Sequence, residues 1–239
     1  MVSTVQQIAL SALYNYGDDI PKKLLDYILT IPAEHLIPKL ELMLEESLSD
    51  QCDEKGTGLY PLHALLLLGE LKSEKSLPLI LKIFGQPESY LEYWFDDYLS
   101  ENLWQVITQT AINNLDDLLT FIKIPINYLY ARWAVLNGVS NMLFIHPEKH
   151  QEINKWYERL LDYLYNKSKD NEFNSAVLIE LKNIKPSSEL IEQTKKFFTK
   201  KKIDKFMVGN WNDYYKNLNN NDNKVSLPKS IADVYASHY

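Results

Sequence analysis

The sequence has few of the residues on which several common classes of protein depend. Its single cysteine, Cys52, excludes a disulfide framework and any zinc site built from several cysteines. Seven glycines are too few for glycine-rich phosphate loops and argue against a turn-rich all-β fold. No apolar run approaches the roughly 20 residues of a transmembrane helix, and residues 1–13 lack the basic start of an export signal. These absences predict a cytoplasmic protein with no membrane span.

Arginine is also scarce, since Arg132 and Arg159 are the only two among 25 basic residues. The net charge of −7 is unevenly distributed: residues 1–120 hold 19 acids and 7 bases, whereas residues 121–239 hold 13 acids and 18 bases. Phosphate contacts from basic side chains supply most of the affinity for nucleic acids. The sequence therefore predicts no nucleic-acid partner.

What the sequence does contain is a succession of apolar stripes with helical spacing. The composition, with 46% hydrophobic and 24% charged residues, is typical of a globular protein that is large enough to bury a core. Val5, Ile8, Ala9 and Ala12 form the first stripe. Residues 61–69 are apolar almost all round, which predicts a helix that is buried on several sides. No alternating run indicates a β-strand.

The predicted helices come in antiparallel pairs with short connections. A third helix is expected to start near Pro38, because proline fits the first position of a helix. Later pairs begin near residues 60, 98, 127 and 172, an irregular spacing that suits HEAT-like repeats of roughly 40–47 residues. We predict an all-α fold, an α–α superhelix that forms one domain over residues 1–218. A flexible linker and a short tail are expected over residues 219–239.

Three stretches together carry a family resemblance: HALLLLGELKSEKSLPLILKIF (63–84), YLYARWAVLNGVSNML (128–143) and KKKIDKFMVGNWNDYYKNL (200–218). They resemble a bacterial uncharacterised family catalogued as domain of unknown function 1186. The resemblance covers residues 60–218 and implies the same HEAT-like helical array. Since no activity is established for that family, the resemblance implies no catalytic residue.

Acidic and aromatic side chains are interleaved between Tyr90 and Trp104. The segment has too many rings for one short helix to bury on a single face, so we expect some of them to line an accessible groove beside carboxylates. Such a groove would bind a lysine- or arginine-bearing ligand through charge and cation–π contacts. The candidate binding residues are Tyr90, Trp94, Asp96, Asp97 and Trp104. Two alternatives remain: the rings pack while the acids cap the next helix, or the carboxylates perform acid–base catalysis.

Histidine and cysteine offer further candidates. His63 begins the most apolar helix and joins the candidate binding residues, although a buried histidine with satisfied hydrogen bonds is the alternative. Cys52 is expected to be an incidental thiol. His146 and His150 have a spacing that can hold zinc on one helical face, but Pro147 is expected to be the first helical residue and leaves His146 outside the helix. We predict no metal site and no cofactor.

Arg132 lies in an otherwise apolar helix. A buried guanidinium needs a carboxylate partner, and Asp116 and Asp117 are the nearest candidates in chain order. A structural ion pair and an anion-binding role both remain open. Lysines between residues 195 and 205 are expected to form a solvated helix end, with an electrostatic docking patch as the alternative.

No residue pattern in the chain matches a catalytic signature. The sequence therefore predicts a non-enzymatic interaction or scaffold module whose partner is another protein or a basic peptide. The alternative is a small-molecule hydrolase or lyase with a carboxylate site near Asp96 and Asp97. The oligomeric state is not predicted.

Overall fold

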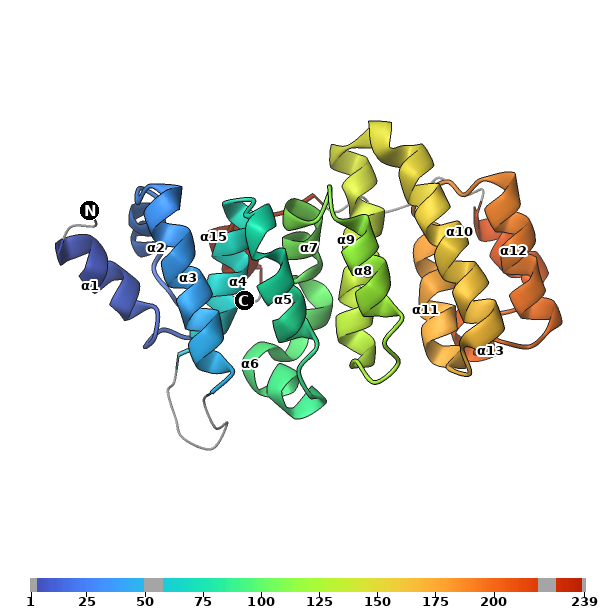
Figure 1. Ribbon diagram of the computed structural model, residues 1–239, viewed down its shortest axis with the longest axis horizontal. Coiled ribbons are helices and arrows are strands. Elements are labelled where there is room, and N and C mark those ends of the chain that lie inside the picture. The colour runs from blue at the N-terminus through green and yellow to red at the C-terminus, as the bar shows by residue number, and fades with distance from the viewer. Residues whose placement is uncertain (1–3, 50–57, 219–226, 238–239) are drawn as a thin grey trace. The chain divides into compact units, whose positions relative to one another are not determined.

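The computed structural model describes residues 4–49, 58–218 and 227–237 (Figure 1). Over these residues every regular element is a helix and none is a β-strand, which confirms the all-α prediction. The chain divides into two compact units, one comprising Met1–Ala111 with Pro228–Tyr239 and the other Ile112–Leu227. Cys52 lies outside the described residues, as do residues 219–226 of the predicted linker.

The first unit is built around one helix, α4. Its members are α1 (Thr4–Ala12), α2 (Lys22–Ile28), α3 (Ala33–Ser47), α4 (Tyr60–Glu70), the 3-10 helix η1 (Glu74–Ser76), α5 (Leu77–Phe84), α6 (Glu88–Glu101), α7 (Trp104–Thr110) and α15 (Ile231–Ala236). Helix α4 packs against α3, α6, α7 and α15. Every residue from Tyr60 to Gly69 is buried, as the all-round apolar sequence predicts. The last helix, α15, reaches this unit from the far end of the sequence.

Gly69 allows α4 to approach α7 closely. A Cβ atom at this position would lie 3.2 Å from the Cα atom of Val106, tighter than ordinary van der Waals contact. The α4–α7 contact therefore depends on a residue without a side chain.

Two local predictions for this unit are wrong. Helix α3 begins at Ala33 with Pro32 as its N-cap, so Pro38 lies inside the helix and not at its start. In α1, Val5 is 61% and Ile8 is 65% exposed, whereas the neighbouring Leu10 is buried. The buried face of α1 is thus rotated away from the stripe that the spacing predicted, because tertiary contacts decide which of two apolar faces is covered.

The second unit contains seven α-helices within the part of the chain that is described. They are α8 (Leu115–Ile122), α9 (Leu129–Ile145), α10 (His150–Lys167), α11 (Asn171–Leu181), α12 (Ser188–Thr199), α13 (Lys205–Val208) and α14 (Trp211–Leu218), with the 3-10 helix η2 (Pro147–Lys149) before α10. Helix α9 packs against α8, α10 and α11, and α10 packs against α8 and α12. The small residues Ala131, Ala134 and Gly138 are buried in α9, where they leave room for neighbouring helices.

Candidate functional site

Helix α6 carries the acidic and aromatic segment and is interrupted at Asp96. The backbone of Asp96 has φ 40° and ψ −128°, a conformation that residues other than glycine rarely adopt. Buried positions follow an i, i+1, i+4, i+5 pattern on both sides of the interruption: Tyr90, Leu91, Trp94, Phe95, Tyr98 and Leu99. The buried face of α6 is therefore about half of its circumference, wider than the sequence suggests.

The rings of this segment are mostly part of the core. Tyr90, Trp94 and Trp104 are each less than one tenth exposed, whereas Tyr93 is 41% exposed. Trp94 packs edge-on against Tyr60, with ring centroids 5.0 Å apart. The Nε1–H group of Trp104 donates a hydrogen bond to the Glu101 carbonyl at 2.9 Å. The expectation that Tyr90, Trp94 and Trp104 line an accessible groove is therefore wrong, because α4 and α7 pack against α6.

Asp96 and Asp97 are exposed, so they lie away from the buried rings. The structure does not bring carboxylates and aromatic faces together in the way that the predicted site requires. The alternative capping role is also wrong for the next helix, because the N-cap of α7 is Leu103 and no side chain accepts a hydrogen bond there. Asp96 and Asp97 belong to the acidic surface of the first unit.

His63 is fully buried in α4, and both ring nitrogens are engaged. Nε2 lies 3.0 Å from the Tyr16 carbonyl, and Nδ1 lies 2.5 Å from the Tyr235 hydroxyl of α15. A carbonyl can only accept, so Nε2 carries the proton and Nδ1 accepts from Tyr235. Burial lowers the pKa of His63 from 6.5 to about 4. His63 therefore joins α4 to α15 as a neutral side chain, which agrees with the alternative of a satisfied buried histidine.

The ion pair predicted for Arg132 exists, but with a different partner. Nη1 of Arg132 lies 3.0 Å from Oδ2 of Asp170. Asp116, which the chain order favoured, instead pairs with Arg159 at 2.6 Å. The Arg132 pair joins α9 to the residue before α11, and these two helices pack together. Packing between distant helices thus overrides proximity in the sequence.

The other histidine and lysine candidates have local roles. Nε2 of His150 lies 2.9 Å from the Ile184 carbonyl, and Nδ1 of His146 lies 3.2 Å from a Glu148 oxygen. Most of the lysines between residues 195 and 205 are exposed. Among the described residues, no three histidine, cysteine or acidic side chains are grouped so as to hold a metal ion. No helix in the described ranges is both long and apolar enough to cross a membrane.

A buried carboxylate that sequence reasoning missed joins α9 and α11. Glu180 accepts hydrogen bonds from Nε1 of Trp133 at 2.9 Å and from Nδ2 of Asn183 at 3.1 Å. Burial raises the pKa of Glu180 above its usual value. Its partners are neutral donors, Trp133 on α9 and Asn183 just after α11, so the arrangement serves as a structural link between the two helices.

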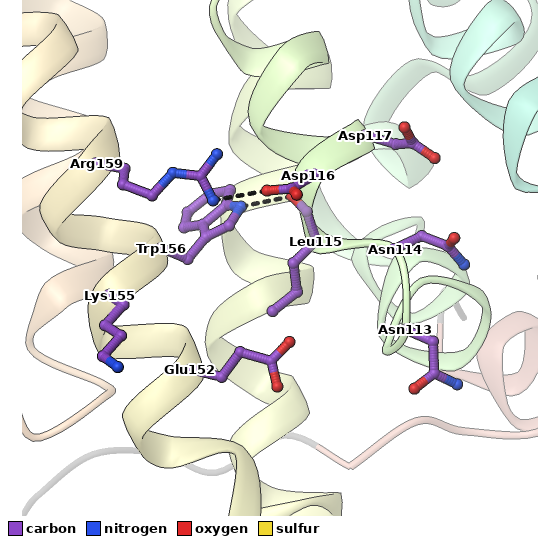
Figure 2. A pocket seen from close by; sticks show the side chains of 9 residues that line it. All are labelled: Asn113, Asn114, Leu115, Asp116, Asp117, Glu152, Lys155, Trp156 and Arg159. Carbon is purple, nitrogen blue, oxygen red and sulfur yellow. Dashed lines mark hydrogen bonds and ion pairs between the residues drawn. The ribbon is translucent and has the colours of Figure 1, made fainter.

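The second unit carries an open groove between the start of α8 and one face of α10 (Figure 2). Its volume is about 420 Å³, and Trp156, which is only 2% exposed, is among the residues that line it. The indole Nε1–H donates to the Leu115 carbonyl at 2.7 Å and thereby joins α10 to α8. The residues that line the groove are Asn113, Asn114, Leu115, Asp116, Asp117, Glu152, Lys155, Trp156 and Arg159.

The groove presents both signs of charge. Asp116 is engaged by Arg159, and Glu152 is engaged by Lys149 at 2.8 Å. Among the described residues, Asp117 and Lys155 form no ion pair; Asp117 lies on α8 and Lys155 lies on α10 (Figure 2). The helical spacing of residues 152, 155 and 159 places them on one face of α10. That spacing is the signal from which this face could have been found, but the sequence does not reveal that α8 lies opposite.

Comparison with known proteins identifies a family but no activity. The family described as "Protein of unknown function (DUF1186)" matches residues 4–230. An uncharacterised protein of Chlamydia trachomatis serovar D is 21% identical over 179 residues, which span 74% of this chain and 70% of the relative. No solved structure is significantly similar to the chain. Because the match extends over nearly the whole sequence, this chain belongs to the DUF1186 family of proteins of unknown function.

Proposed function

We propose that this protein is a non-enzymatic interaction module that holds a segment of another protein in the groove between α8 and α10. The observation that carries the proposal is the presence of two oppositely charged side chains, Asp117 and Lys155, among the residues that line this groove, neither with an ion-pair partner among the described residues. The segment that fits is extended and presents a basic residue to Asp117 and an acidic residue to Lys155. This partner is a peptide with a basic element, in line with the partner class expected from the sequence.

The remaining groups of the groove suit a peptide backbone. The amide side chain of Asn114 offers a donor and an acceptor, which matches the N–H and C=O groups of a peptide bond. Trp156 also lines the groove, and its indole nitrogen is already satisfied by the Leu115 carbonyl. The groove is open, so a chain can enter and leave without unfolding.

The array around the groove is HEAT-like in this proposal. Helix α9 packs against α8, α10 and α11, and α10 packs against α8 and α12, which supports a stack of helix pairs that share a core. A cytoplasmic location also remains part of the proposal. The alternative carboxylate-based hydrolase or lyase gains no support, because Asp96 and Asp97 are both exposed.

Site-specific photo-crosslinking tests the location of the site. A photoreactive phenylalanine analogue replaces Asn113 in the full chain, and a matched protein carries it at the exposed Asp162 of α10, which does not line the groove. We expect a discrete partner to crosslink at position 113 and not at position 162. The partner, once identified by mass spectrometry, is purified for titration.

Charge reversal then tests the chemistry. Lys155→Glu and Asp117→Lys should each weaken partner binding by roughly tenfold or more, because each places like charges together. Restoring attraction with a compensating charge change in the partner should recover the affinity. Lys195→Glu, an exposed change outside the groove, is the control and should leave the affinity unaltered. Wild-type affinity in both groove variants would refute the proposal.

A further inference from the structure

A second pocket in the same unit has a very different charge. It lies where the chain after α8, the end of α10 and the residues before α11 meet, and its volume is about 430 Å³. Four cationic side chains line it, Lys123, Arg132, Lys167 and Lys169, against a single carboxylate, Asp170. The protein as a whole is acidic, so this concentration of positive charge is local.

Arg132 is the buried element of the pocket, with a side chain only 3% exposed. Its Nε donates to the Ile122 carbonyl at 3.1 Å, and its Nη1 donates to Asp170 at 3.0 Å. The guanidinium carbon lies 3.4 Å from the centre of the Phe173 ring, so the group makes a cation–π contact with that ring. Nη2 makes no hydrogen bond among the described residues, so its donors remain available to a molecule in the pocket.

The one carboxylate in the pocket is already occupied. Oδ2 of Asp170 accepts from Arg132, and Oδ1 accepts from the backbone N–H of Phe173 at 2.9 Å, where Asp170 caps α11. The loop that carries Asp170 is held in place, because Lys202 donates to the Ser168 carbonyl at 3.0 Å. Asp170 therefore orients the guanidinium, and the three lysines leave an excess of positive charge at the opening.

One wall of the pocket is apolar. Tyr163 and Leu164 of α10 line it together with the lysines. The Tyr163 hydroxyl donates to the Lys123 carbonyl at 3.0 Å, which fixes the ring, and the Lys123 ammonium lies 5.1 Å from the ring centre. A ligand with both an anionic group and a hydrophobic part can thus be matched on two sides.

We infer that this pocket binds a small phosphate monoester. Nη2 of Arg132 and the ammonium groups of Lys167 and Lys169 hold the phosphate, and the organic part lies against Tyr163. A dianion suits a cluster with several cations and one engaged carboxylate better than a singly charged carboxylate does. The pocket volume falls within the range of about 300–1,000 Å³ that small-molecule sites occupy. This inference does not depend on the proposed peptide groove.

Calorimetric titration of the full chain with phenyl phosphate tests the inference. We expect saturable binding at one site, tighter than that of inorganic phosphate, because phenyl phosphate also contacts Tyr163. The affinity for phenyl phosphate should also exceed the affinity for a phosphoserine pentapeptide, whose backbone is too bulky for the pocket. Tighter binding of the phosphopeptide would overturn the small-molecule assignment, and no saturable binding of any phosphate compound would overturn the site.

Matched lysine variants locate the binding. The double variant Lys167→Gln with Lys169→Gln, at two exposed positions, should weaken phenyl phosphate binding by roughly tenfold or more. The control, Lys195→Gln with Lys196→Gln, removes the same charge from exposed positions outside the pocket and should leave the affinity unchanged. Equal weakening in both double variants would show that phenyl phosphate is attracted by the overall charge of the protein and not by this pocket, and would overturn the inference. Circular dichroism checks that each variant is folded.

Discussion

The indole of Trp94 packs against Tyr60 and Tyr93, with ring centroids 5.0 and 4.8 Å away, and is only 4% exposed. Its Nε1–H group is buried and has no hydrogen-bond partner among the described residues. The ring thus contributes packing, while its polar group contributes a desolvation cost. This residue, which the sequence suggested as a binding residue, has the environment of a core side chain.

We therefore expect Trp94→Ala to lower the free energy of unfolding by about 3–5 kcal/mol, because it leaves a large cavity. Trp94→Phe should cost much less, since it keeps most of the ring and removes the unpartnered N–H. Urea denaturation of the two variants and the wild type measures the difference. If Trp94→Ala is as stable as the wild type, the indole is not part of the core.

The imidazole of His63 predicts a pH dependence of stability. Its pKa is lowered to about 4 in the folded protein against 6.5 as the ordinary value, so the unfolded chain binds the proton first as pH falls. The stabilisation from neutral His63 is complete above pH 6.5 and is lost as pH falls towards 4, by about 2 kcal/mol at pH 5. The charged groups that face it are Asp18 and Asp19.

Unfolding of the wild type and of His63→Gln at pH 7 and pH 5 measures this contribution. The Gln variant lacks the titrating ring but retains a donor, and other titrating groups affect both proteins alike. We expect the wild type to lose more stability than the variant between the two pH values. Equal losses would mean that His63 does not titrate in this range.

At the scale of elements, two ion pairs of similar chemistry differ in burial. Arg132 and Asp170 join α9 to the start of α11, and the arginine side chain is 3% exposed. Arg159 and Asp116 join α10 to α8, and their side chains are 57% and 79% exposed. Water screens the exposed pair of Arg159 and Asp116. If Asp170 were removed, by contrast, the guanidinium of Arg132 would stay buried without a charged partner.

Asp170→Ala should therefore lower the free energy of unfolding by about 3–5 kcal/mol, through the lost pair and the lost helix cap. Asp116→Ala should change it by about 1 kcal/mol or less. Thermal or urea unfolding of the two variants makes the comparison directly. A larger cost for Asp116→Ala would support the pairing that chain order suggested and contradict the observed one.

At the scale of the whole molecule, the first unit includes both ends of the described chain. Helix α15 packs against α2 and α4, and it buries Ile231, Val234 and Tyr235. Two backbone N–H groups of this segment donate to side chains of the unit: Lys229 to Gln105 at 2.8 Å and Ile231 to Glu70 at 3.0 Å. The C-terminal segment is thus part of the core of the first unit.

Removal of residues 228–239 should destabilise that unit by a few kcal/mol. Three buried side chains are lost, and His63 loses the hydrogen bond that its Nδ1 accepts from Tyr235. Hydrogen exchange measured by mass spectrometry should become faster in α4 and α2. Tyr235→Phe, which removes only the hydroxyl, should have a smaller effect of about 1 kcal/mol. Unchanged exchange in α4 after the truncation would show that α15 contributes nothing to this core.

Local features of the sequence were enough to predict the helical class, the buried helix over residues 61–69 and the burial of Arg132. Apolar spacing reports which residues share a helical face, and that information is contained within a few turns. It could not decide whether Val5 and Ile8 or Leu10 would be the covered face of α1. Apolar spacing also underestimated how much of α6 is buried, since the neighbouring helices decide how wide its buried face is.

The sequence by itself determined that this chain forms amphipathic and fully apolar helices, because the residue period acts over neighbouring turns. The tertiary structure alone decided that Arg132 meets Asp170 and that His63 meets Tyr235. It also decided that α8 faces α10 across a groove of mixed charge. These contacts join residues that are distant in the chain, and their energies depend on burial and distance, which no local pattern of residues specifies.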